Sequence, residues 1–124
     1  DTTAYDNLGK LYHFSLQDYP KSEAYFLKSI QIAPYSMVPY LELFQLYTYS
    51  YKQSTTLAVD ILTKAVVQFP LATDPLTLLA SYYRDRGEFE KAREYFLKAL
   101  DIARTEGNVA LISSIGRELE RLPK

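Results

Sequence analysis

Three pairs of small residues recur along the chain at a nearly constant spacing. The members of each pair are seven residues apart, and the pairs are Ser22/Ser29, Ala58/Ala65 and Ala92/Ala99. The first members are separated by 36 and then 34 residues, and a lysine just before each second member keeps the same steps. A fixed period in this range is typical of stacked helix pairs that share one continuous core. The sequence therefore predicts an all-α repeat fold.

Apolar residues three and four positions apart surround these pairs and predict two amphipathic helices in each unit. In the first unit we expect helices over residues 2–15 and 20–33, and in the second unit over residues 37–50 and 54–68. The small residues would let the two backbones of a unit approach closely, while tyrosines fill the space beside them.

Local signals mark the ends of these helices. Ser36 and Thr73 are predicted N-caps, and Pro39 and Pro75 fall in the first turn, where a missing N–H costs nothing. Gly87 is predicted to end the first helix of the third unit. The first two units lack a glycine there, and we expect their one and two extra residues to lengthen the loop between the helices.

One more amphipathic helix is predicted over residues 108–122, beyond the last repeat. It does not repeat the pattern of small residues, and a repeat stack needs a terminal element that covers its last apolar face. We therefore expect it to act as a cap. Gly116 lies inside this helix and predicts either a close backbone approach or a local bend.

Composition excludes several classes of function. The 124 residues suffice for one domain, the formal net charge is −1, and no basic stripe suggests nucleic-acid binding. There are no cysteines, the only histidine is His13, and no glycine-rich phosphate loop is present, so we expect no metal, no cofactor and no catalytic residues. No apolar run approaches the roughly 20 residues that span a bilayer, and the compartment stays open. The chain begins with Asp1 instead of Met, and we expect it to be a piece of a longer protein.

The repeated unit also has a recognisable signature. The first unit reads Tyr5-x-x-Leu8-Gly9-x-x-Tyr12, then Ser22-x-x-x-Phe26, then Pro34. This resembles the tetratricopeptide repeat, a helix–turn–helix unit with the signature W-x-x-L-G-x-x-Y, then A-x-x-x-F, then P. The match extends over residues 2–104, although Tyr or Leu replaces Trp and Phe44 stands where a small residue is usual.

The resemblance implies a right-handed α-solenoid of three antiparallel helix pairs with a seventh, capping helix. The whole chain, 1–124, would then be a single domain, with repeats at about 2–35, 36–71 and 72–105 and the capping helix at 108–122.

It further implies a concave groove, lined by the first helix of each unit, that receives a peptide or a helix of a partner protein. Carried over by register, the groove positions are Asp6, Asn7, Lys10, His13, Glu42, Gln45, Tyr49, Asp74, Ser81 and Arg84. The subtype that clamps the carboxyl terminus of heat-shock chaperones uses Lys, Asn and Arg where this chain has Asp6, Lys10, Glu42, Asp74 and Leu78. A basic ligand with apolar or aromatic character suits such a groove better than an acidic one.

Our leading hypothesis is a non-catalytic protein-interaction module. Two alternatives stay open, namely an accessory domain of a larger enzyme, for example a membrane-bound one, and a self-association module that forms homo-oligomers. Tyr35, Tyr49 and Tyr51 lie outside the signature and are candidates for a partner surface.

Overall fold

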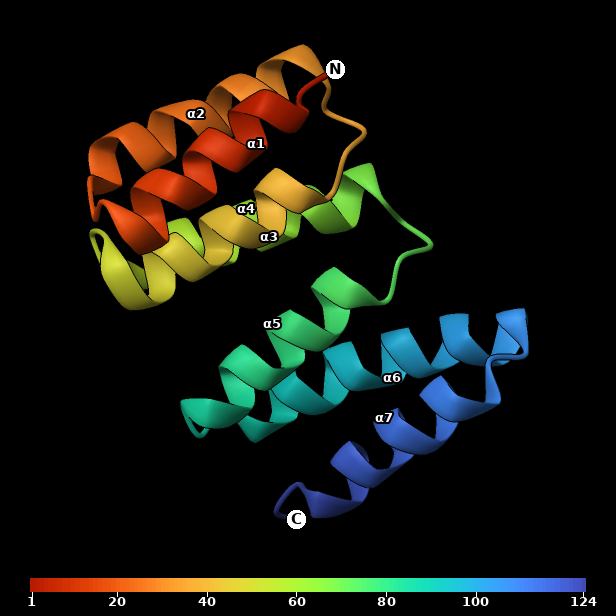
Figure 1. Ribbon diagram of the computed structural model, residues 1–124. Coiled ribbons are helices and arrows are strands. Elements are labelled where there is room, and N and C mark those ends of the chain that lie inside the picture. The colour runs from red at the N-terminus through yellow and green to blue at the C-terminus, as the bar shows by residue number, and fades with distance from the viewer. The chain divides into compact units, whose positions relative to one another are not determined.

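The computed structural model describes residues 1–124, and every regular element in it is helical (Figure 1). The elements are α1 (Thr3–Lys10), η1 (Leu11–Ser15), α2 (Tyr19–Ile32), α3 (Val38–Gln45), η2 (Leu46–Ser50), α4 (Thr55–Gln68), α5 (Asp74–Asp85), α6 (Phe89–Glu106) and α7 (Val109–Arg121). The all-α prediction is thus confirmed, with seven α-helices and two π-helical turns, η1 and η2. The residues group into two compact units, Asp1–Phe69 and Pro70–Lys124.

The first unit contains two helical hairpins. Helix α1 with η1 packs on α2, α3 with η2 packs on α4, and α2 packs on α3. The small residues Ser22, Ser29, Ala58 and Ala65 are completely buried, which confirms their predicted place between the paired helices.

Close backbone contact in the first hairpin depends on Gly9. A methyl group at this position would lie 2.6 Å from ring carbons of Phe26, whose side chain is fully buried. The hydroxyl of Ser22 donates a hydrogen bond to the Gly9 carbonyl over 2.8 Å, so α2 contacts the backbone of α1 at the same point. Glycine is therefore required here for space, since its backbone conformation is that of an ordinary helix.

Glu23 links the two hairpins. The Tyr47 hydroxyl donates to its Oε2 over 2.6 Å, and the Lys52 ammonium lies 3.2 Å from the same oxygen. Glu23 belongs to α2, whereas Tyr47 is in η2 and Lys52 is in the loop that follows. Because burial and the neighbouring carboxylate both disfavour the phenolate, the pKa of Tyr47 is raised well above its usual range.

The sequence predicted that the extra residues of the first two hairpins lengthen the loops between the helices. This prediction is only partly right. One residue of each hairpin is absorbed at the end of the first helix, where the helix widens into a π-turn. The amide of Leu16 donates to the Leu11 carbonyl and that of Tyr51 to the Leu46 carbonyl, five residues back in each case. The two π-turns, η1 and η2, are 35 residues apart and share the sequence Leu-Tyr-x-x-Ser. A π-turn is the usual result when a helix accommodates one inserted residue.

The loops after these π-turns place non-glycine residues in the left-handed region. Gln17 has φ 53°, and Lys52 and Gln53 have φ 65° and 41°. The second unit uses Gly87 at the equivalent point, with φ 77°, and this glycine ends α5 as predicted. The first two hairpins therefore reverse direction with backbone strain that the third avoids.

The second unit has a third hairpin and one further helix. Helix α5 packs on α6, and α6 packs on α7; Ala92 and Ala99 are fully buried between the paired helices. Helix α7 follows Gly107, and the Asn108 side chain caps it by accepting from the amide of Leu111. It is continuous through Gly116, and a methyl group there would meet nothing within 4 Å, so the predicted close approach is wrong.

The predicted helix starts are partly right. Pro39 and Pro75 do stand in the first turns of α3 and α5. Ser36, however, is not the N-cap of α3, because that position belongs to Met37, which offers no capping side chain. Thr73 does precede α5, but its side chain makes no capping hydrogen bond.

Candidate functional site

Three charged side chains of the first helices interact on one side of the first unit. Asp6 and Lys10 are one turn apart on α1, and Glu42 comes from α3. Asp6 is buried and accepts a 2.6 Å hydrogen bond from the Ser29 hydroxyl of α2. Both α1 residues act electrostatically on Glu42, so the three charges form one cluster drawn from two hairpins.

Glu42 is the least satisfied member of this cluster. Burial raises the pKa of its carboxyl group, the Lys10 ammonium lowers it, and the Asp6 carboxylate raises it, with burial the largest effect. Its Oε2 is buried and has no hydrogen-bond partner. A cation beside this half-buried carboxyl group would favour its ionised form and reduce the cost of burying it.

His13 lies one turn beyond Lys10, in η1. The residue is only 5% exposed, and its Nε2 is 2.7 Å from the Ser50 hydroxyl at the end of η2. The ring stacks on Phe14 at a centroid distance of 4.1 Å and meets the edge of Tyr19 at 5.8 Å. Burial lowers the pKa of the imidazole, and its Nδ1 is buried without a hydrogen-bond partner.

Thr48 occupies the same register position in η2 as His13 does in η1, 35 residues later. Its hydroxyl is also buried without a partner. The buried side-chain polar atoms that lack a hydrogen bond are therefore the Glu42 Oε2, the His13 Nδ1 and the Thr48 hydroxyl, all on the first helices of the two hairpins. Each such group costs about 1–3 kcal/mol when it stays unpaired.

Two exposed aromatic rings accompany these polar atoms. Phe14 and Tyr49 directly follow His13 and Thr48 in the two π-turns, and they are 59% and 69% exposed. We call this part of α1–η1 and α3–η2 the first-helix face, made of Asp6, Lys10, His13, Phe14, Glu42, Thr48 and Tyr49. The predicted groove residues Asn7 and Gln45 belong to the same helices and are exposed.

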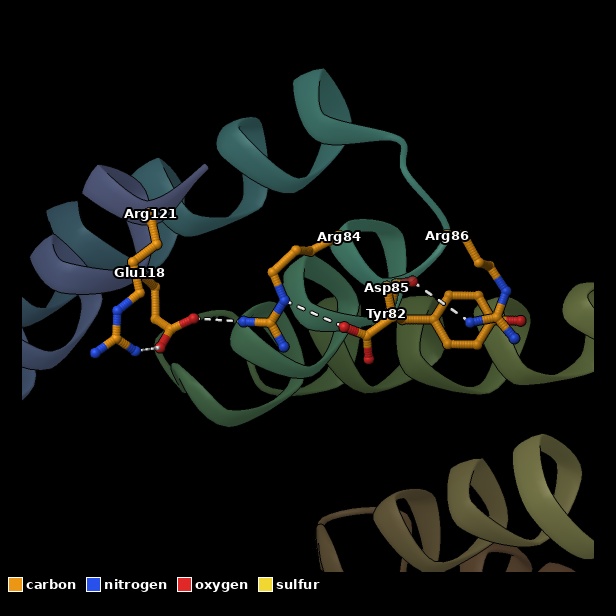
Figure 2. A network of polar contacts seen from close by, with 6 residues as sticks. All are labelled: Tyr82, Arg84, Asp85, Arg86, Glu118 and Arg121. Carbon is orange, nitrogen blue, oxygen red and sulfur yellow. Dashed lines mark hydrogen bonds and ion pairs between the residues drawn. The ribbon is translucent and has the colours of Figure 1, made fainter. Parts of the chain in front are cut away.

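The second unit holds the other three predicted groove residues. Asp74 is exposed at the start of α5, and Ser81 is half-buried. Arg84 is already engaged, since its guanidinium forms an ion pair with Glu118 of α7 and lies 3.2 Å from Asp85 (Figure 2). Glu118 also approaches Arg121 at 3.5 Å, so Arg84 connects α5 to the final helix.

Next to this network, Arg86 covers the ring of Tyr82 (Figure 2). Its guanidinium carbon is 3.4 Å from the ring centroid, and its Nη1 donates to the Tyr82 carbonyl over 3.4 Å. This cation–π contact stabilises the C-terminal end of α5.

The sequence did not reveal several residues that shape the first-helix face. Ser29 and Ser50 are the partners of Asp6 and His13, from positions 23 and 37 residues away. Phe14 and Thr48 were also missed. A strict 35-residue register would have found them, since Phe14 lies 35 residues before Tyr49 and Thr48 lies 35 residues after His13. Of the other candidate tyrosines, Tyr35 is exposed.

No three His, Asp or Glu side chains gather in a way that could hold a metal ion. None of the helices has both the length and the apolar character that a membrane crossing requires.

Comparison with known proteins agrees with this arrangement of helices. Two family models, both described as a tetratricopeptide repeat, match residues 2–36 and residues 76–106, which together are more than half of the chain. The first match covers the hairpin α1–η1–α2, and the second covers most of α5 and all of α6. No match was found among curated proteins. Tetratricopeptide repeats generally serve as protein-interaction modules, and the chain belongs to the tetratricopeptide repeat family.

Proposed function

We propose that the first-helix face binds a peptide segment or a helix of a partner protein, and that the chain acts as a single, non-catalytic domain over residues 1–124. The observation that carries this proposal is the pair of exposed rings, Phe14 and Tyr49, which stand at matching positions of η1 and η2 on the first helices that also carry Lys10 and Glu42. Exposed aromatic rings of this kind are typical of a surface that a partner covers.

The chemistry of the face favours a basic ligand. Glu42 presents a carboxylate whose desolvation is only partly offset by Lys10, so an incoming Lys or Arg would pair with it. The exposed rings of Phe14 and Tyr49 offer surfaces on which the stem of that residue, or an apolar neighbour, would pack. An acidic ligand would be repelled by the carboxylates of Asp6 and Glu42.

Selection from a displayed random peptide library would test this function. We expect enriched peptides to contain Lys or Arg next to an apolar or aromatic residue. Glu42→Gln and Tyr49→Ala should each weaken binding of a selected peptide by roughly tenfold, as expected when a partly buried charge pair or an aromatic contact is lost.

Glu90→Gln is the matched control, because Glu90 is an exposed carboxylate on α6, outside the first-helix face. It should leave the affinity unchanged. Selected peptides that bind the Glu42→Gln and Tyr49→Ala variants as tightly as the unsubstituted chain would exclude the first-helix face as the binding site.

A further inference from the structure

Helix α7 has the residue pattern of a first helix. Four of its residues stand at the spacing of the first half of the repeat signature, namely Ile112, Ile115, Gly116 and Leu119. Gly116 lies 36 residues after Ala80 of α5, which in turn lies 36 residues after Phe44 of α3. Helix α7 also packs on α6, the second helix before it, as α3 packs on α2. It is therefore equivalent to the first helix of a further hairpin.

In the first hairpin, these register positions face the second helix. The equivalent of Gly116 in α1 is Gly9, where the ring of Phe26 from α2 fills the space beside the backbone. Tyr12, three residues after Gly9, stacks on Tyr25 of α2 at a centroid distance of 5.5 Å. This side of α1 is thus the surface that holds α2.

The third hairpin uses the same side of its first helix. Ala80, at the position of Gly9, is completely buried. Tyr83 stacks on Tyr95 of α6 at 5.8 Å, which repeats the ring contact of the first hairpin. A second helix therefore covers this side in both hairpins.

Helix α7 leaves the equivalent side open. A methyl group at Gly116 would meet nothing within 4 Å. Val109 is 77% exposed and Ser113 is exposed as well, whereas their equivalents in α1, Thr2 and Asp6, are buried. We call this surface of α7 the Gly116 face, made of Val109, Ile112, Ser113, Gly116 and Leu119. No part of the chain fills the space at its glycine.

We propose that the Gly116 face binds a helix of a partner protein that has the pattern of the chain's own second helices: a small residue, an aromatic residue four positions later, and a second small residue three positions after that. The aromatic ring would fill the space at Gly116 as Phe26 does at Gly9. The two small residues would let the backbones approach closely, as Ser22 and Ser29 do in α2. Apolar surface of α7 would be buried at the same time.

A second copy of the chain does not offer such a helix. The small residues of its second helices are completely buried inside their own hairpins, including Ser22 of α2, Ala58 of α4 and Ala92 of α6. Presenting one of these helices to another copy would require a hairpin to open. We therefore expect the bound helix to come from another protein.

The sequence of α6 supplies a probe for this surface. A synthetic peptide of residues 88–107 with blocked termini carries Ala92, Phe96 and Ala99 in the required pattern. We expect it to bind the whole chain in a fluorescence anisotropy titration. A second peptide with Ala92→Leu and Ala99→Leu is more apolar but too bulky for close approach. It should bind roughly tenfold or more weakly.

Substitutions in the chain locate the site. Gly116→Gln should weaken binding of the first peptide by roughly tenfold or more, because the new side chain takes the space of the aromatic ring. It should not lower the melting temperature of the chain, since Gly116 lies inside α7 with open space around it. Ser114→Gln is the matched control, because Ser114 is exposed on the opposite side of the same helix. It should leave the affinity unchanged, as should Glu42→Gln, which separates the Gly116 face from the first-helix face.

Three results would overturn the proposal. The first is that the unsubstituted peptide does not bind, or binds no more tightly than its leucine variant. The second is an unchanged affinity in Gly116→Gln, which would mean that the peptide replaces α6 in its own hairpin. The third is a concentration-dependent dimer in sedimentation that Gly116→Gln abolishes, because a second copy would then occupy the face.

Discussion

At the scale of single residues, the contact between Gly9 and Phe26 is the tightest constraint on the first hairpin. Gly9→Ala should lower the free energy of unfolding by about 1–3 kcal/mol, because the new methyl group would overlap a fully buried ring. Urea denaturation would measure the change. Gly116→Ala is the control: it has open space around it inside α7 and should raise stability by about 0.5–1 kcal/mol. If Gly9→Ala were as stable as the unsubstituted chain, the close packing described here would be wrong.

His13 makes a second prediction at the same scale. Because burial lowers the pKa of its imidazole, the unfolded chain binds more protons at this residue than the folded chain does. Its contribution to stability is therefore complete above the unfolded pKa of about 6.5 and is lost as the pH falls toward the folded pKa. Glu42 has a raised pKa, so its contribution to stability is present below its unfolded pKa and is lost as the pH rises above that value. The free energy of unfolding in urea, compared between the unsubstituted chain and His13→Gln, gives the contribution of the histidine alone. This difference should shrink from pH 7.5 to pH 5. A difference that stays constant would contradict the prediction.

At the scale of elements, the two π-turns and the loops after them distinguish the first two hairpins from the third. Gln17 adopts φ 53°, where the third hairpin uses glycine. Gln17→Gly should therefore stabilise the chain by about 0.5–1 kcal/mol, the balance between relieved strain and greater freedom of the unfolded chain. Ala24→Gly, at an exposed site inside α2, should instead cost about 1 kcal/mol. Thermal unfolding of both variants would measure these changes. A Gln17→Gly variant that is less stable than the unsubstituted chain would show that Gln17 is not strained.

The same elements show what the sequence could and could not reveal. The helix pairs and the buried small residues were predictable, because a period of 34–36 residues and helical apolar spacing are both visible in the chain. The π-turns were not, since one inserted residue looks the same in sequence whether it widens a helix or lengthens a loop. In the candidate site, Asp6 and His13 were expected to line a groove, and both are largely buried. Their partners Ser29 and Ser50 are distant in sequence, so no local pattern announces these hydrogen bonds.

At the scale of the whole molecule, the single-domain proposal makes a cooperative unfolding transition the expected behaviour. Ala58 and Ala99 are fully buried, one in each compact unit. Ala58→Leu and Ala99→Leu should each cost about 1–3 kcal/mol through overpacking. In a single domain both substitutions lower the midpoint of one common transition in calorimetry. Two transitions, each moved by only one of the substitutions, would show that the two units unfold independently.

A backbone amide NMR titration of the whole chain with a library-selected basic peptide would show whether the first-helix face receives a partner segment. We expect the shifted resonances to fall on α1–η1 and α3–η2, around Glu42 and the rings of Phe14 and Tyr49. Shifts confined to other helices, with these two segments unchanged, would exclude binding at this face.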